Sequence, residues 1–228
     1  MKKLFLFAIA FLLFSAAVFA QESKTFSLSG FDKLAMGSAF KIDVKKGSQF
    51  SITATGQPDD IKDLEAKVTS GILKIGYRGN SWNKNRKTVN INITMPALEA
   101  VDFSGASKAQ VGSFPNSKTM AVEVSGASSV TMNFTAPKVS FELSGASSLT
   151  ILGQCDVLNG EVSGASSFKG EGFQAKEVNI EASGASNAYV MASASVHADA
   201  SGASRIRYGG GAKDIRSNSS GASSVKRD

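Results

Sequence analysis

The stretch of sequence that decides the fold runs from residue 139 to residue 168 and reads VSFELSGASSLTILGQCDVLNGEVSGASSF. It contains the tetrapeptide Ser-Gly-Ala-Ser twice, and each copy follows a short run in which apolar and polar side chains alternate. The chain of 228 residues holds seven copies, at intervals of 21, 19, 19, 20, 18 and 19 residues. The copies begin at Ser104, Ser125, Ser144, Ser163, Ser183, Ser201 and Ser220. Such even spacing is typical of a repeat protein, in which each repeat is one structural unit.

The residues before each glycine predict a β-strand. The positions two and four residues before the glycine are apolar in most copies, and the position between them is acidic in all but the last. The residues at this middle position are Asp102, Glu123, Glu142, Glu161, Glu181, Asp199 and Asn218. A period of two places the apolar side chains on one face of a strand and the acids on the other, which faces solvent.

The length of the unit indicates a solenoid. No copy has apolar residues at the 3.6-residue period of a helix, and a propeller blade needs about 40–45 residues. We therefore predict an all-β fold, a single-chain parallel β-helix or β-solenoid with coils of 18–21 residues. Each strand is expected to pair with its equivalents in the coils above and below, ~4.8 Å away. Right-handed crossovers are strongly preferred between parallel strands.

The glycine of the tetrapeptide has a predicted structural role. A bend that recurs in every coil needs a residue that accepts positive φ or a close approach of backbone, and glycine does both. The serines can hydrogen-bond along the stack or to the backbone of the bend. The repeat glycines are Gly105, Gly126, Gly145, Gly164, Gly184, Gly202 and Gly221.

The chain divides into three predicted segments. Residues 1–20 are a cleaved signal peptide, residues 21–97 form a less regular N-terminal β-module that caps the solenoid, and residues 98–228 form the regular stack. Alternation in the second segment predicts strands at residues 40–44, 50–54, 72–77 and 89–94. A short helix or turn is expected at residues 59–68. Gly37-Ser38-Ala39 resembles a degenerate copy of the repeat, which indicates that the solenoid starts before residue 98.

The first 20 residues have the parts of an export signal. Lys2 and Lys3 precede an apolar run, and Val18 and Ala20 occupy the −3 and −1 positions that signal peptidase reads. The run is shorter than the ~20 apolar residues that span a bilayer. We therefore expect export to the periplasm, the cell surface or the medium, with no transmembrane segment in the mature chain.

Charge and cysteine content narrow the class of protein. The 25 Lys and Arg of the chain, less Lys2 and Lys3, leave 23 basic side chains against 19 acidic ones, a balance too mild to indicate nucleic acid binding. Residues 21–97 hold 12 basic against 7 acidic side chains, so an anionic partner would favour this third of the chain. Cys155 is the only cysteine, so no intramolecular disulfide can form, and we expect it to be a small buried residue.

From residue 26 to residue 225 the sequence resembles the family called the putative auto-transporter adhesin, head GIN domain. The resemblance is carried by N-terminal strands such as residues 40–44 and 71–75, by the strand-Ser-Gly-Ala-Ser-strand copies, and by the closing Tyr208-Gly209-Gly210. It implies a parallel β-helix-like fold, an exported location and a role in adhesion. The family has no established activity or catalytic residues, so the resemblance implies no mechanism.

The row of acids admits two interpretations. Carboxylates stacked ~4.8 Å apart repel one another unless a cation bridges them or solvent screens them. Oxygen-rich rows suit Ca²⁺, but the G-G-x-G-x-D repeat of calcium-binding β-rolls does not occur in the chain. We expect a solvated face, no metal site and no cofactor.

The sequence does not indicate a catalytic site. Nothing marks the single histidine, His197, as the partner of a serine, so a hydrolase triad is not expected. The acids recur at the same place in every copy, whereas an active site would break the pattern at one place.

A further candidate site is the segment from residue 78 to residue 87, between two predicted strands. Its basic groups surround the only tryptophan, and a cationic loop with an aromatic ring can bind anionic glycans through charge and stacking. The alternative is a solvated hairpin loop with the tryptophan packed locally. The candidate ligand-binding residues are Arg78, Trp82, Lys84, Arg86 and Lys87.

These features predict an exported interaction protein of the envelope or the extracellular space, an adhesin whose partner is a glycan or a protein. One alternative is a carbohydrate-active β-helix enzyme, which would show a groove with non-repeating acids. A second is an ice-binding-like solenoid that orders a surface. A flat, exposed serine face would favour this second alternative, and buried serines would contradict it.

Overall fold

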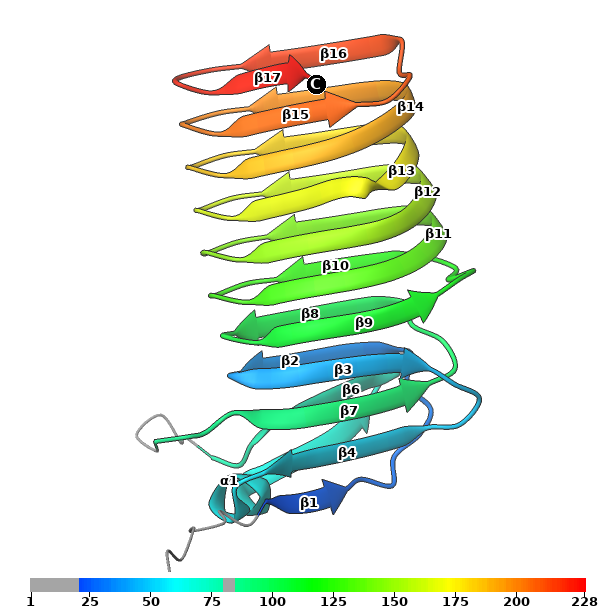
Figure 1. Ribbon diagram of the computed structural model, residues 1–228, viewed down its shortest axis with the longest axis vertical. Coiled ribbons are helices and arrows are strands. Elements are labelled where there is room, and N and C mark those ends of the chain that lie inside the picture. The colour runs from blue at the N-terminus through cyan, green and yellow to red at the C-terminus, as the bar shows by residue number, and fades with distance from the viewer. Residues whose placement is uncertain (1–20, 80–84) are drawn as a thin grey trace, which may run out of the picture.

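The computed structural model of the chain describes residues 21–79 and 85–228. These residues form an elongated β-solenoid, in which seventeen strands belong to one continuous sheet (Figure 1). The fold class predicted from the repeat is confirmed. Within the described ranges, no helix is long and apolar enough to cross a membrane.

The elements of the N-terminal third are β1 (Glu22–Thr25), β2 (Lys33–Ser38), β3 (Phe40–Lys46), β4 (Ser51–Gly56), α1 (Pro58–Asp63), β5 (Leu64–Thr69), β6 (Ile72–Tyr77) and β7 (Val89–Met95). The strands that follow are β8 (Ala100–Gly105), β9 (Lys108–Phe114), β10 (Met120–Val124), β11 (Ser129–Leu143), β12 (Ser148–Val162), β13 (Ser167–Ala182), β14 (Asn187–Ala200), β15 (Arg205–Gly209), β16 (Asp214–Ser219) and β17 (Ser224–Arg227). Strands β11 to β14 are long and bend, so each contributes to two faces of the solenoid (Figure 1).

The coils present two broad outer faces, which meet at the Ser-Gly-Ala-Ser turns. The acidic face consists of β6, β2, β8, β10, the C-terminal halves of β11–β14, and β16, paired in that order. The polar face consists of β4, β7, β3, β9, the N-terminal halves of β11–β14, β15 and β17. These pairings are parallel, as predicted, except that β4 runs antiparallel to β7.

The solenoid begins before residue 98. Strand β2 pairs in parallel with β8, and the register sets Ser38 beside Gly105. Ser38 has a φ of +128°, so the degenerate copy in the sequence turns at the same place without a glycine there. Strands β2 and β3 therefore form the coil below β8 and β9, although β4–β7 separate them in the sequence (Figure 1).

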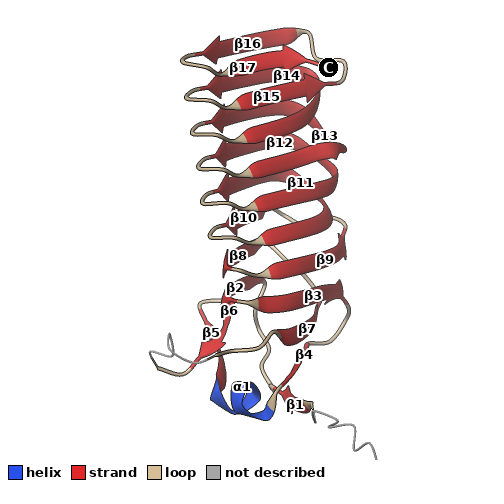
Figure 2. Cartoon of the chain, turned by 60° about the vertical axis from the view of Figure 1, so that its left-hand side comes forward, coloured by secondary structure: helices blue, strands red, loops and turns tan. Residues whose placement is uncertain are grey.

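Helix α1 and antiparallel strands close the N-terminal end of the solenoid (Figure 2). The four strands predicted in this third are β3, β4, β6 and β7. The prediction of a helix or turn over residues 59–68 was wrong in extent, because the helix ends at Asp63 and β5 follows. Leu64, Ala66 and Val68 pack on the core with polar residues between them, which is the period of a strand, and β5 pairs with β6.

One hydrophobic core runs through the described part of the solenoid. The rings of Phe141 and Phe168 stack inside it, with their centroids 4.0 Å apart. Gly160 leaves room for the Phe141 ring, which a Cβ at that position would overlap. Cys155 is 7% exposed, as expected for a small core residue, and burial raises the pKa of its thiol to about 12.

Candidate functional site: the turns and outer faces

Each Ser-Gly-Ala-Ser turn stacks on the turn of the coil below. All seven repeat glycines have a φ between +69° and +75°. The alanine N–H of one turn donates to the glycine carbonyl of the turn below, as Ala146 does to Gly126 at 2.8 Å. A Cβ on Gly145 would lie 2.6 Å from that same carbonyl oxygen. Both the positive φ and the close approach of backbone require glycine here, while the alanine beside it is exposed.

The last serine of the tetrapeptide is an internal hydrogen-bonding residue. In the first six copies this serine is at most 2% exposed. Ser147 Oγ donates to the carbonyl oxygen of Val124 at 3.1 Å, and Ser204 Oγ donates to that of Ala182 at 3.0 Å. These hydroxyls satisfy backbone groups of the coil below. The row is therefore not the flat, exposed serine lattice that an ice-binding-like surface would need.

The acidic face carries a row of carboxylates, one from each of six consecutive coils and in register. The six residues are Asp102, Glu123, Glu142, Glu161, Glu181 and Asp199. All six are exposed, as the alternation predicted, and none forms an ion pair with another described residue. The row ends at Asn218, whose Nδ2 donates to Asp199 Oδ1 at 2.7 Å.

Crowding within the row shifts carboxyl pKa values. Repulsion from Asp102 is the largest of the effects that raise the pKa of Glu123, followed by burial and by repulsion from Glu142. Burial raises the pKa of Asp102, and the nearby Lys74 opposes this shift. Both carboxyls therefore bind a proton more readily than a free carboxyl does.

A shallow groove of about 510 Å³ lies beside the N-terminal part of the row. Small side chains, among them Ala100, Ala121 and Ser140, line it together with the carboxylates. The acids of the groove repeat from coil to coil, whereas a glycosidase needs one particular pair at a set separation. Within residues 21–79 and 85–228, no three His, Cys, Asp or Glu side chains are grouped to hold a metal ion.

The single histidine lies in a second row of the acidic face. The register places Asn179 on one side of His197 and Arg216 on the other. Its Nε2 is buried and has no hydrogen-bond partner among the described residues. The row thus places an amide and a guanidinium on either side of the histidine.

The candidate loop is only partly described, because Trp82 and Lys84 lie outside the described residues. Arg78 and Lys87 are exposed. Arg86 differs from them, because its side chain is only 14% exposed and points toward the N-terminal helix.

Arg86 belongs to a partly buried ion cluster. Its guanidinium nitrogens lie 3.3 Å from Asp60 Oδ1 and 2.8 Å from Asp63 Oδ2, and its Cζ lies 3.9 Å from the centre of the Tyr77 ring. The backbone N–H of Lys87 also donates to Asp60, at 3.0 Å. Burial is the largest of the effects that raise the pKa of Tyr77 to about 12. The structure therefore separates Arg86 from the exposed cations of the loop.

The sequence did not indicate a hollow that lies on the polar face, where β7, β3 and β9 meet. Its residues come from distant parts of the chain, including Lys41, Asn90 and Lys108. The only available signal was Lys108, which stands where the next copies have Ser129 and Ser148.

The family model described as "Putative auto-transporter adhesin, head GIN domain" matches residues 30–212, which is most of the chain. Among curated proteins, none matches the sequence.

Several solved structures share the fold. A crystal structure of a putative adhesin from Bacteroides fragilis matches with a TM-score of 0.84 at 16% identity, covering 92% of this chain and 97% of that chain. A putative adhesin from Parabacteroides distasonis matches with a TM-score of 0.71 at 16% identity, covering 92% and 97%. A putative lipid binding protein from the same species matches with a TM-score of 0.68 at 16% identity, covering 91% and 96%. At this identity the likeness concerns the fold alone.

Proposed function

Because the chain belongs to the family of putative auto-transporter adhesins with a head GIN domain, we propose that it is an exported, non-enzymatic interaction protein that adheres through the outer faces of its solenoid. The relatives of known structure that share its fold include proteins called putative adhesins.

One observation carries this proposal, namely the rows of outward side chains that stay in register along the stack. The longest acidic row crosses six coils without a shift of register at any acid. The sheet below fixes the spacing of these side chains at ~4.8 Å, so a polymeric partner can meet many equivalent groups at once. Many weak contacts on a rigid surface give useful affinity without any deep pocket.

The same rows support a binding role over a catalytic one. Burial raises the pKa of Asp102, and repulsion from Asp102, burial and repulsion from Glu142 raise the pKa of Glu123, all within a repeated row. A catalytic pair would instead occur at one place in the chain, with its acid and its base in different environments that move their pKa values apart. The predicted signal peptide at residues 1–20 supports export.

The proposal is tested by fractionation and by binding. The mature chain, residues 21–228, is expected in an exported fraction, and the purified protein is expected to sediment with envelope or cell-surface material in a saturable way. Ser140→Arg and Thr150→Arg, one on each face, should weaken binding, while Ala146→Arg at the exposed turn serves as the matched control. A chain retained in the cytoplasm, or one that binds no such fraction, would contradict the proposal. Release of new reducing ends from a polysaccharide would contradict its non-enzymatic part.

A further inference from the structure

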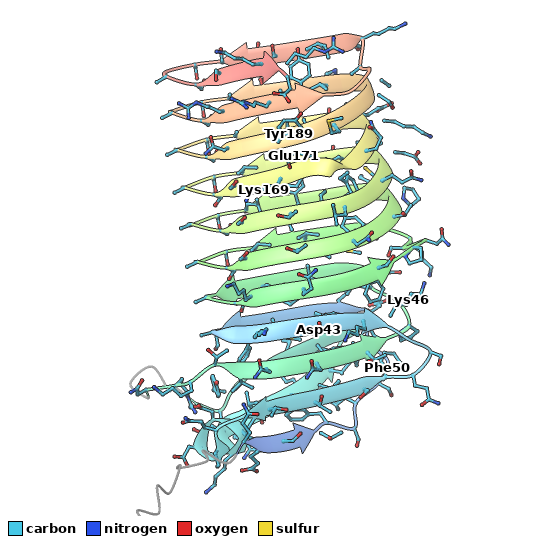
Figure 3. The ribbon with its side chains drawn as sticks, in the orientation of Figure 1. Asp43, Lys46, Phe50, Lys169, Glu171 and Tyr189 are labelled. Atoms are coloured by element: carbon cyan, nitrogen blue, oxygen red, sulfur yellow. The ribbon has the colours of Figure 1, made fainter. Side chains whose placement is uncertain are left out.

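A hollow on the polar face gathers outward side chains from five strands. Strands β4, β7, β3, β9 and β11 lie side by side there and form two rows. The first row is Thr55, Asn90, Lys41, Lys108 and Ser129, and the second is Thr53, Asn92, Asp43, Gln110 and Thr131. All except Thr53 line a hollow of about 550 Å³. At ~4.8 Å between strands the rows extend over about 19 Å. Figure 3 labels Asp43 on this face.

The hollow holds long polar side chains where the middle coils of the polar face have small hydroxyls. Above Lys108 the same position is occupied by Asn187, Arg205 and Ser224 in the last coils, and by Ser129, Ser148 and Ser167 in the three coils next to it. Below them, in β9, β3 and β7, long cationic and amide side chains replace these small hydroxyls. Within this row of described side chains, only the hollow sets two cations on adjacent strands.

Two lysines in the hollow lie side by side without a counter-ion. The register sets Lys41 directly opposite Lys108 on the adjacent strand, and both side chains are exposed. No ion pair joins either ammonium group to an acid within the described ranges. Asp43, in the second row, pairs with Lys45 at 3.3 Å. Like charges directly opposite destabilise a sheet, so an anion held between the lysines would relieve repulsion as well as add contacts.

The other side chains of the hollow match a partner rich in hydroxyl groups. Asn90, Asn92 and Gln110 each present two N–H donors and one carbonyl acceptor. Thr55 and Ser129 add hydroxyls that both donate and accept. Two lysines alone would suit any small anion, but this surrounding set of amides and hydroxyls suits the hydroxyls of sugar rings.

We propose that this hollow binds a short acidic oligosaccharide, with a uronic-acid carboxylate between Lys41 and Lys108 and ring hydroxyls on Asn90, Asn92 and Gln110. The inference rests on the proposed function, because it names the class of ligand through which the solenoid adheres. The excess of basic side chains in residues 21–97 attracts a polyanion to this end of the molecule. Added salt screens that attraction and weakens binding.

Calorimetric titration of residues 21–228 with trigalacturonate tests the proposal. We expect saturable binding that the double variant Lys41→Gln/Lys108→Gln weakens about tenfold or more, because two charge-assisted contacts are lost. The variant should fold, since it removes a repulsive pair. The control Lys169→Gln/Lys226→Gln removes the same charge from the polar face outside the hollow and should keep wild-type affinity. Lys169 is labelled in Figure 3.

Inorganic phosphate and neutral galactotriose separate an acidic sugar from a simple anion or a neutral sugar. Asn92→Ala should weaken trigalacturonate binding several-fold and leave any phosphate binding unchanged. Four results would each overturn the proposal: equal weakening by both lysine pairs, phosphate binding as tight as trigalacturonate, galactotriose binding as tight as trigalacturonate, or no trigalacturonate binding at millimolar concentration.

The two proposals fail in different ways. A protein that binds envelope or cell-surface material but not trigalacturonate would overturn this inference and leave the proposed function in place. A protein that binds trigalacturonate in the hollow but no such material would overturn the proposed function and leave the ligand class in place.

Discussion

Gly145 and its six equivalents meet two constraints that the repeated turn imposes together. Their φ lies in the left-handed region, and their Cα faces a carbonyl oxygen of the coil below. Serine takes the equivalent place only at the first coil, where Ser38 has a φ of +128°. The constraints act on single residues, but the stacking makes every copy subject to them.

Gly145→Val should lower the free energy of unfolding by about 3 kcal/mol, because a β-branched side chain must adopt positive φ and displace the backbone below. Gly76→Val is the matched control, since a Cβ at Gly76 meets no atom within 4 Å and its φ is not positive. Chemical denaturation of both variants measures the difference. Equal stabilities would show that the turn tolerates a side chain.

Arg86 is the loop residue whose role the local sequence predicted least well. Its partners Asp60 and Asp63 lie on and at the end of α1, more than twenty residues away in the sequence. No local sequence pattern predicts this pairing. Lys87, the next residue in the chain, is exposed.

Arg86→Gln should destabilise the protein by about 3 kcal/mol, because it leaves the nearly buried Asp60 carboxylate without its cation. Lys87→Gln, which removes the same charge from an exposed position, should be close to neutral. Thermal melts of the two variants provide the comparison. If the Arg86→Gln protein is as stable as the wild type, the guanidinium is not needed for stability, and a role in ligand binding would better explain it.

Strands show how far periodicity predicts structure. The alternation around each acid gave β8, β10 and the C-terminal halves of the long strands, with their outward faces, because these pairings recur every 18–21 residues. The place of β3 between β7 and β9 was predictable only on one side, since β9 follows the next copy of the turn but β7 follows no copy of the repeat. The hollow depends on that placement of β3, so its residues could be named from the sequence but their proximity could not be predicted.

The acidic row should make stability depend on pH. A carboxyl whose folded pKa is raised binds a proton more readily in the folded chain, so its contribution to stability grows as pH falls through the folded pKa and is complete below the unfolded pKa. Asp102 and Glu123 both have raised pKa values. Melting temperatures between pH 7 and pH 4 should therefore show a stabilising contribution that Asp102→Asn/Glu123→Gln lacks. Parallel pH profiles for the two proteins would contradict this.

The same row is expected not to depend on calcium. Glu142→Gln/Glu161→Gln removes two neighbouring charges and should be neutral or slightly stabilising at neutral pH. Millimolar calcium should leave the melting temperatures of wild type and variant unchanged. A rise of several degrees in the wild type alone would establish a cation site in the row.

At the scale of the whole molecule, the C-terminal coil differs from the coils below it. All but one of the side chains of β16 are exposed, and β17 is at most half-buried. Polar terminal repeats protect the edge of a solenoid from pairing with another chain. The coil below holds Ile206, which is fully buried.

Truncation after Gly211 removes β16 and β17 and should leave a folded protein that associates more readily, because β15 and the end of β14 become the open edge. Light scattering on the truncated and full-length proteins at matched concentration measures this. A truncated protein as monodisperse as its parent would show that the edge is protected in another way.

The insertion of β2 and β3 below β8 and β9 also sets the order in which the molecule can assemble. A regular coil closes on the previous one over about 19 residues, as between Ser129 and Ser148, but Lys41 meets Lys108 across 67 residues. The longer closure costs about 1 kcal/mol more in chain entropy and must occur before the first coil has a partner above it. A chain that emerges from a translocation pore N-terminus first can pair β2 with β6 and β3 with β7, but it carries an open edge along β2 and β3 until β8 and β9 arrive. From there each new coil pairs with a coil that has already folded. We therefore expect the N-terminal end of the solenoid to fold slowly and the coils above it to form quickly.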